Sequence, residues 1–143
     1  MHLGIYLERE EIKAVFHTHP PFTVGLISAG VELKPVFPDF VAVLGRKIPV
    51  VDYVVPGGEE IRKAVVKEIK KSNVVLLKNH GVVCIGETFK EAYARSLIVE
   101  EAAKTILSGI IAGKLRYLTD KEVEEIENLE VEDYRKNLLK KTE

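Results

Sequence analysis

Residues 73–113 constrain the fold more than any other part of the chain. Two short apolar runs, "VVLL" and "GVVCIG", stand on either side of Lys-Asn-His, and a long segment with helical periodicity follows them. Short apolar runs bounded by turn residues predict buried strands. Two buried strands followed directly by a long amphipathic helix favour a layered α/β architecture, because the apolar faces of sheet and helix must cover each other.

The helix expected at residues 88–113 carries signals at both ends. Thr88 and Glu91 have the spacing of a capping box, and Gly113 stands where a helix commonly ends. The residues predicted to form its inward-facing stripe are Phe89, Ala92, Val99, Ala103, Ile106 and Ile110.

The rest of the chain alternates in the same way. Helices are expected at residues 1–10, 20–30 and 59–71, and strands at 12–19, 41–45 and 48–55. A last helical segment is expected from a second capping box at Thr119 and Glu122. The order of these elements predicts one layered α/β domain.

Composition narrows the class of protein. A chain of 143 residues suits one domain, and a net charge of −1 gives no electrostatic footprint for nucleic acid. No run of eighteen apolar residues and no signal-peptide pattern occur, so we expect a cytoplasmic protein that does not enter a membrane. The one cysteine, Cys84, lies in an apolar run and is interpreted as a core residue in a reducing compartment.

Three of the four histidines form a candidate metal site. His17 and His19 stand one residue apart at the end of an expected strand, so both face the same side while Thr18 points away. A catalytic zinc site uses three protein ligands and keeps one position open, and His80, before Gly81 in a tight turn, is the candidate third ligand. From the residues alone, histidines bonded to backbone or water remain an equal alternative, and His2 is interpreted as a surface residue.

Two stretches carry a family resemblance. "AVFHTHPPFTVGL" and "VVLLKNHGVVCIGETFKEAYARSLIVEEAAK" resemble the class II aldolase/adducin family, over about residues 1–113. The resemblance implies a three-layer α/β/α fold with a mixed, mostly antiparallel sheet. It also implies a divalent metal, usually Zn²⁺, held by His17, His19 and His80, and a homo-oligomer, usually a tetramer, with active sites between subunits. Adducin-type members keep the fold without the metal site.

The chain departs from the family pattern in its start and in one loop. The family's phosphate-binding segments and its acid/base glutamate lie upstream of the position of Met1, so residues 1–143 are expected to be one class II aldolase-like domain truncated at its N-terminus. Glu8, Glu10 and Glu11 do not fit the glutamate motif. The loop "KPVFPDF" lacks a tyrosine that the aldolases carry there, and Asp39 occupies that region.

A further tyrosine is a candidate catalytic residue. Tyr134 matches, to within one residue, an aldolase tyrosine that reaches the neighbouring subunit's site. The alternative is a packing residue on a helix beside Leu138.

The expected activity follows from the resemblance. It implies a metal-dependent aldehyde-lyase that cleaves a phosphorylated sugar such as L-fuculose 1-phosphate, weak or inactive without the upstream glutamate. The alternatives are a metal-binding but non-catalytic chain or an oligomeric interaction module, and a dehydratase or 4-epimerase of the same family. A carboxylate within the chain, such as Asp39 or Glu100, is the candidate acid/base group if these residues alone are active.

Overall fold

The computed structural model describes residues 1–131 and 137–138. The helices are α1 His2–Glu8, α2 Pro21–Ser28, α3 Pro38–Leu44, α4 Glu59–Ile69, α5 Phe89–Ile111 and α6 Asp120–Glu127. The strands are β1 Ala14–Thr18, β2 Val50–Val51, β3 Val74–Leu77 and β4 Gly81–Gly86.

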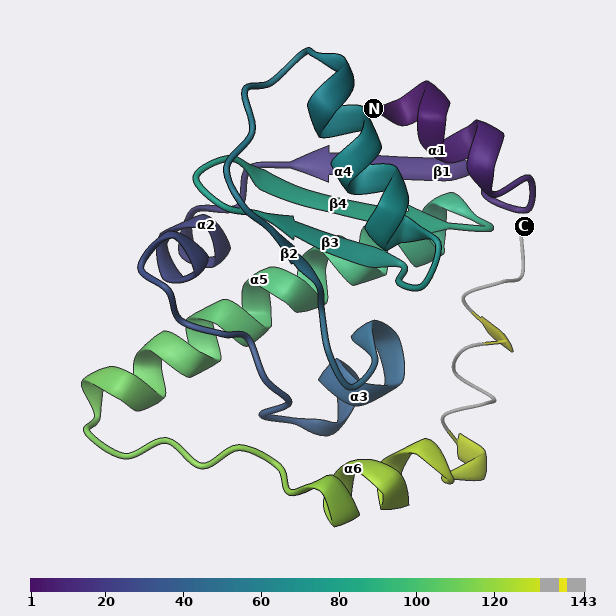
Figure 1. The fold of residues 1–143 in the computed structure, drawn as a ribbon. Helices are drawn as coiled ribbons and strands as arrows, with labels where there is room; N and C mark the ends of the chain where they lie inside the picture. The colour runs from purple at the N-terminus through teal and green to yellow at the C-terminus, as the bar shows by residue number, and fades with distance from the viewer. Residues whose placement is uncertain (132–136, 139–143) are drawn as a thin grey trace.

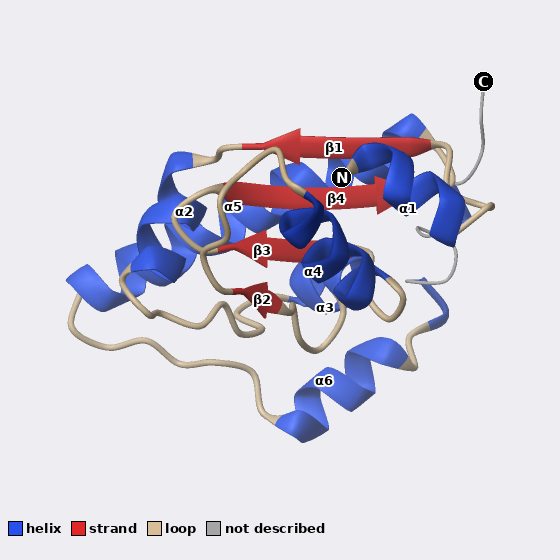
Figure 2. Cartoon of the chain, turned by 45° about the horizontal axis from the view of Figure 1, so that its top comes forward, coloured by secondary structure: helices blue, strands red, loops and turns tan. Residues whose placement is uncertain are grey.

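The strands form one sheet in the order β1-β4-β3-β2. β4 lies antiparallel to both β1 and β3, and β2 lies parallel to β3 at one edge (Figure 2). A mixed, mostly antiparallel sheet was expected, and the structure confirms it. The register places His17 opposite Val83, which fixes where β1 ends relative to the turn between β3 and β4.

Helices cover both faces of the sheet, which confirms the three-layer α/β/α fold (Figure 1). Alternate residues of the central strands belong to different cores, as the pleat of a strand requires. Leu76 and Cys84 pack with α2, α3 and α5 on one face, whereas Leu77 and Val83 pack with α1 and α4 on the other. Cys84 is fully buried, as expected, and burial raises the pKa of its thiol to about 12.

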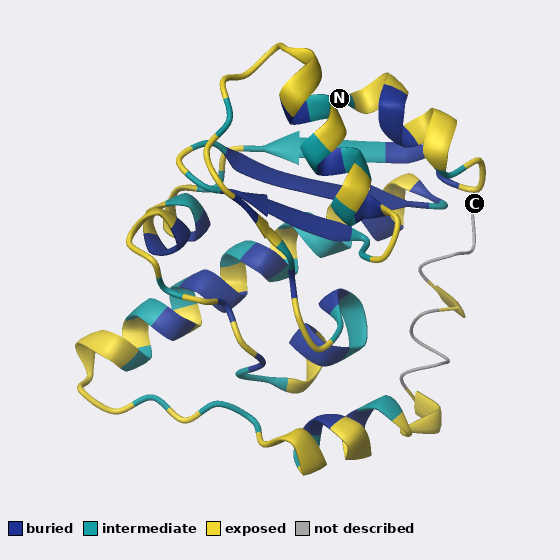
Figure 3. Cartoon of the chain, viewed as in Figure 1, coloured by how far each residue is buried: buried dark blue, intermediate teal, exposed yellow. Residues whose placement is uncertain are grey.

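Helix α5 spans the sheet but extends beyond it. Ala92, Val99, Ala103 and Ile106 of the predicted stripe are buried. Phe89 and Ile110 were expected to face inward and do not, since they are 66% and 46% exposed. A helix of 23 residues is about 35 Å long, and its C-terminal end runs past the sheet and is exposed (Figure 3). Phe89, at the other end, lies at the rim of the core, where its ring contacts that of Phe16 in β1 at a centroid distance of 5.0 Å.

Two expected strands differ in the structure. Residues 41–44 belong to α3, which begins with Pro38 in its first turn, and Gly45 is the C-cap of this helix with a φ of +87°. The strand expected at 48–55 shortens to Val50–Val51, with Tyr53 and Val55 exposed beyond it. The carbonyl of Pro49 accepts the amide of Leu76, but proline has no N–H to donate in return. The regular pairing of β2 with β3 therefore cannot extend toward the N-terminus of β2.

The capping box at the start of α6 is confirmed, since the side chains of Thr119 and Glu122 each bind the other residue's backbone amide. In the described part of the chain, no helix has both the length and the apolarity needed to cross a membrane.

Candidate metal centre

Strand β1 places His17 beside the neighbouring strand β4. The Nδ1–H of His17 donates to the carbonyl of Val82 at 3.0 Å. Thr18 points to the opposite face, where its hydroxyl lies 3.3 Å from that of Ser96 on α5. The predicted separation of the two histidines from Thr18 is therefore observed.

His19 follows the last residue of β1 and precedes Pro20 and Pro21, with which α2 begins. Each proline fixes its own φ near −65°, and the residue before a proline is restricted to extended conformations. His19 is thus held in an extended link between the sheet and a helix, and its side chain is exposed.

The turn between β3 and β4 carries His80. Its amide donates to the carbonyl of Leu77, and Asn79 before it has a φ of +53°, in the left-handed region. Gly81 closes the turn at a point of close approach. A Cβ there would lie 2.3 Å from the carbonyl oxygen of Thr18 and 2.6 Å from Cδ2 of His19, so only glycine lets the turn approach the histidine pair.

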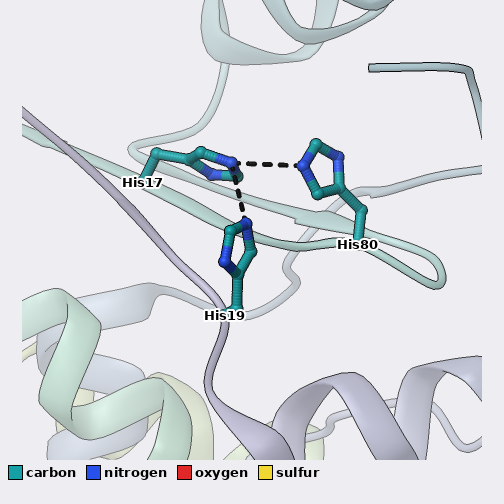
Figure 4. Close-up of side chains that lie close together, drawn as sticks. All are labelled: His17, His19 and His80. Atoms are coloured by element: carbon teal, nitrogen blue, oxygen red, sulfur yellow. Dashed lines mark hydrogen bonds between the residues drawn. The ribbon is translucent and has the colours of Figure 1, made fainter.

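The three imidazoles point toward one another from β1, from the link after it and from the β3–β4 turn (Figure 4). Nε2 of His17 lies 3.3 Å from Nε2 of His80 and 3.2 Å from Nε2 of His19. All three ligand nitrogens lie within 4.8 Å of one another. Two nitrogens bound tetrahedrally to one Zn²⁺, each at about 2.0–2.1 Å, stand about 3.3 Å apart.

The protonation of the cluster suits metal binding. Because Nδ1 of His17 donates its hydrogen to Val82, the Nε2 lone pair of the neutral ring faces the cluster. Partial burial lowers the pKa of His17, and repulsion from His80, His19 and His2 lowers it further. Burial, followed by repulsion from His19, lowers the pKa of His80. Both rings are therefore mainly neutral at pH 7, which is the form that binds a metal.

The residues present fit a divalent cation. In the described part of the chain, the only polar contact of the His80 ring is Nε2 of His17, while its Nδ1 is buried without a partner. A hydrogen bond between two of these imidazole nitrogens uses one proton and satisfies only that pair. One cation between the rings can accept the lone pairs of all three nitrogens. Imidazole ligands suit zinc and other late transition metals.

Other candidate residues lie elsewhere or are engaged. Tyr134 lies outside the described residues. Asp39 is exposed in the first turn of α3. The carboxylate of Glu100 accepts three hydrogen bonds from Phe22 and Thr23 in α2. Among the described residues, the cluster of converging ligand atoms consists of imidazoles alone.

The structure adds two features that the sequence did not indicate. The ring of His2 in α1 lies edge-on to that of His17, with centroids 6.3 Å apart. The second feature is the close approach at Gly81. The packing of α1 against α4 and the sheet brings His2 there, and no local pattern signals that packing.

Comparison with known proteins identifies the family. The family model described as "Class II Aldolase and Adducin N-terminal domain" matches residues 1–107. The chain therefore belongs to the class II aldolase and adducin family.

Individual relatives agree with this assignment. An L-fuculose phosphate aldolase of Methanocaldococcus jannaschii is 34% identical over 114 residues, which is 80% of this chain and 61% of the relative. A 3-oxo-tetronate 4-phosphate decarboxylase of Haemophilus influenzae is 32% identical and covers 89% of this chain and 62% of its own. A solved L-fuculose 1-phosphate aldolase has a TM-score of 0.80 at 26% identity, over 94% of this chain and 61% of that one. The chain thus spans about three fifths of the length of these proteins.

Proposed function

We propose that the chain holds one divalent metal ion, preferably Zn²⁺, through His17, His19 and His80, and that this centre serves aldolase-type cleavage of a phosphorylated sugar. The observation that carries the proposal is that three imidazole Nε2 atoms from three separate segments converge. Nε2 of His17 lies 3.2 Å from that of His19 and 3.3 Å from that of His80. Family membership supports it, because class II aldolases depend on a divalent metal.

The chemistry would be shared between the ion and the residues around it. A divalent ion supplies Lewis-acid stabilisation of the negative charge that develops on oxygen when a bond beside a carbonyl breaks. His17 is fixed in one tautomer by Val82, and His17 and His80 are both partly buried. His19 is exposed and leaves one side of the cluster accessible to a substrate.

The names of the relatives support two related substrates. L-Fuculose 1-phosphate is the first candidate, because two kinds of comparison, by sequence and by structure, include aldolases named for it. Decarboxylation of 3-oxo-tetronate 4-phosphate is the second, because that relative matches a larger share of this chain. Both reactions break a carbon–carbon bond and leave an electron pair that a nearby carbonyl can accept, so the same centre suits either. Dehydration or 4-epimerisation of a phosphorylated sugar stays a family-based alternative.

We expect a polypeptide of these 143 residues to bind metal but to turn over slowly. General acid/base catalysis contributes typically 10²–10⁴-fold, and the carboxylate of Glu100 is already occupied by α2. The measurement is coupled detection of dihydroxyacetone phosphate from L-fuculose 1-phosphate, with release of carbon dioxide from 3-oxo-tetronate 4-phosphate assayed in parallel.

A longer polypeptide that adds the segment preceding this region in the family should raise the rate by at least about 100-fold. An ordinary enzyme rate of roughly 1–10³ s⁻¹ from the 143 residues alone would contradict the prediction. A group inside these residues would then perform the proton transfer.

We also propose that the chain forms a homotetramer, the assembly that the family resemblance implies. Large apolar side chains stand exposed on two helices, with Leu3 and Leu7 in α1 70% and 72% exposed and Phe89 in α5 66% exposed. Exposed side chains of this size and apolarity, on both faces of the sheet, are candidate contacts between subunits. Sedimentation velocity at micromolar concentration should show a tetramer, and a monomer would contradict this proposal.

A further inference from the structure

Helix α2 begins immediately after His19 but does not cap its own N-terminus. Pro20 stands at the N-cap position, where it offers no side-chain acceptor. The first amides of a helix have no partner within the helix. Those of Phe22 and Thr23 therefore need an acceptor from elsewhere in the fold.

Glu100, in the middle of α5, supplies that acceptor. Its Oε1 accepts the amide of Phe22 at 3.1 Å, and its Oε2 accepts the amide of Thr23 at 2.9 Å. Oε2 also accepts the hydroxyl of Thr23 at 2.8 Å, and Thr23 is fully buried. Three charge-assisted hydrogen bonds and the favourable interaction of a carboxylate with a helix N-terminus thus join α5 to the start of α2.

The hydrogen bonds of Glu100 to α2 can affect the histidine cluster because the backbone segment between them is short and restricted. Only Pro20 and Pro21 separate His19 from the amides that Glu100 binds, and both restrict the backbone. The opposite end of α2 contacts the turn that carries His80, since the hydroxyl of Ser28 accepts the amide of Asn79 at 3.0 Å. Helix α2 therefore lies between the two ligand-bearing segments, and Glu100 fixes its position.

We propose that Glu100 is a positioning residue of the metal centre: by holding the N-terminus of α2 it sets where His19 stands relative to His17 and His80. The inference rests on the proposed metal centre and goes beyond it, because Glu100 contacts neither the ion nor the histidines in this role. Replacing Glu100 with Gln keeps the size of the side chain and removes the charge and one of the two acceptor oxygens.

The first test compares Glu100→Gln with Glu101→Gln. Glu101 is the adjacent residue of α5, is exposed and pairs with Lys104, so its substitution removes the same charge without touching α2. Titration with Co²⁺ should show affinity about tenfold lower for Glu100→Gln, at the lower end of the loss typical of outer-shell partners. The visible absorption bands of bound Co²⁺ should also change shape, because the His19 ligand is displaced. Glu101→Gln should match the wild type in both readouts.

A second test does not depend on a metal. In the metal-free protein, the imidazole nitrogen resonances of His19 should shift or broaden in Glu100→Gln and stay unchanged in Glu101→Gln. Thr23→Val removes the hydroxyl bond to Glu100 and the longer hydroxyl contact with the Val99 carbonyl at 3.4 Å, but keeps both backbone amide bonds to Glu100. It should produce a smaller change of the same kind, and Thr23→Ser should restore the wild-type signal. These variants give a readout even if Glu100→Gln does not fold.

The results of these tests distinguish the positioning role of Glu100 from the metal centre itself. Unchanged Co²⁺ affinity and spectrum in Glu100→Gln, or unchanged His19 resonances, would overturn the positioning role of Glu100 while leaving the metal centre intact. Undiminished Co²⁺ binding after His17→Ala would instead overturn the metal centre itself.

Discussion

Replacing Gly81 with Ala should destabilise the protein by about 3 kcal/mol or more, at the upper end of typical overpacking costs, and should abolish the histidine cluster. The added Cβ would lie 2.3 Å from the carbonyl oxygen of Thr18 and 2.6 Å from Cδ2 of His19. The first contact is with backbone, which cannot move aside as a flexible side chain can. The turn would have to move away from β1, which would carry His80 away from His17. Thermal unfolding should show a melting temperature lower by about 6–12 °C, and metal titration should show loss of tight binding.

Gly25→Ala is the matched control for that substitution. Gly25 lies within α2, and a Cβ there would meet no atom within 4 Å. Alanine is favoured over glycine in a helix interior by roughly 0.5–1 kcal/mol, so this variant should be equally or more stable and should bind metal normally. If Gly81→Ala behaved like Gly25→Ala, the close approach of the turn to β1 would be wrong.

His17→Ala should lower metal affinity by more than about 100-fold, which exceeds the 10–100-fold loss typical of outer-shell partners. His17 is central to the cluster, since its Nε2 is within 3.3 Å of the Nε2 atoms of both other histidines. Its removal leaves His19 and His80, two ligands where a zinc site needs three from the protein. Elemental analysis of protein purified without chelator, followed by competition with a coloured chelator, gives both stoichiometry and affinity.

His2→Ala is a demanding control because His2 is an imidazole in the same neighbourhood. Its ring lies 6.3 Å from that of His17, yet it is not one of the converging ligands. The variant should retain about one metal per chain with nearly wild-type affinity. Equal losses from His2→Ala and His17→Ala would show that the assignment of the three ligands is wrong.

The histidine cluster shows how much a local pattern can predict. Two histidines at alternate positions must share a face of a strand, and the turn before Gly81 placed His80 at a strand end. That position made His80 the candidate third ligand, and the family resemblance implied the same residue. The register of β1 on β4, with His17 opposite Val83, then brings the β3–β4 turn to the end of β1.

The errors in predicted elements have physical causes. The run at residues 41–45 is short and apolar, so periodicity could not distinguish a strand from a buried helix. Pro38 and Gly45, which bound α3, were the available signals. In α5 the middle of the predicted stripe was correct, but periodicity does not tell where along the helix the core ends, and so Phe89 and Ile110 were wrongly placed in the core.

The supports of the cluster could not be predicted from the sequence. The sequence pointed to Glu100 only as a possible acid/base group, whereas its hydrogen bonds depend on α2 packing against α5 with an N-terminus that has no side-chain cap of its own. Likewise, the requirement for glycine at residue 81 arises from atoms of Thr18 and His19, more than sixty residues earlier in the chain. Such long-range contacts appear only when the fold is assembled.

X-ray absorption at the zinc edge of the zinc-loaded chain tests the central claim most directly, because it reports the atoms bound to the ion. We predict one zinc per chain with three imidazole nitrogens at about 2.0–2.1 Å and a remaining light-atom position, and a reduced imidazole count in His17→Ala but not in His2→Ala. A wild-type spectrum with fewer than three imidazoles, or one that His17→Ala leaves unchanged, would contradict the metal centre at His17, His19 and His80.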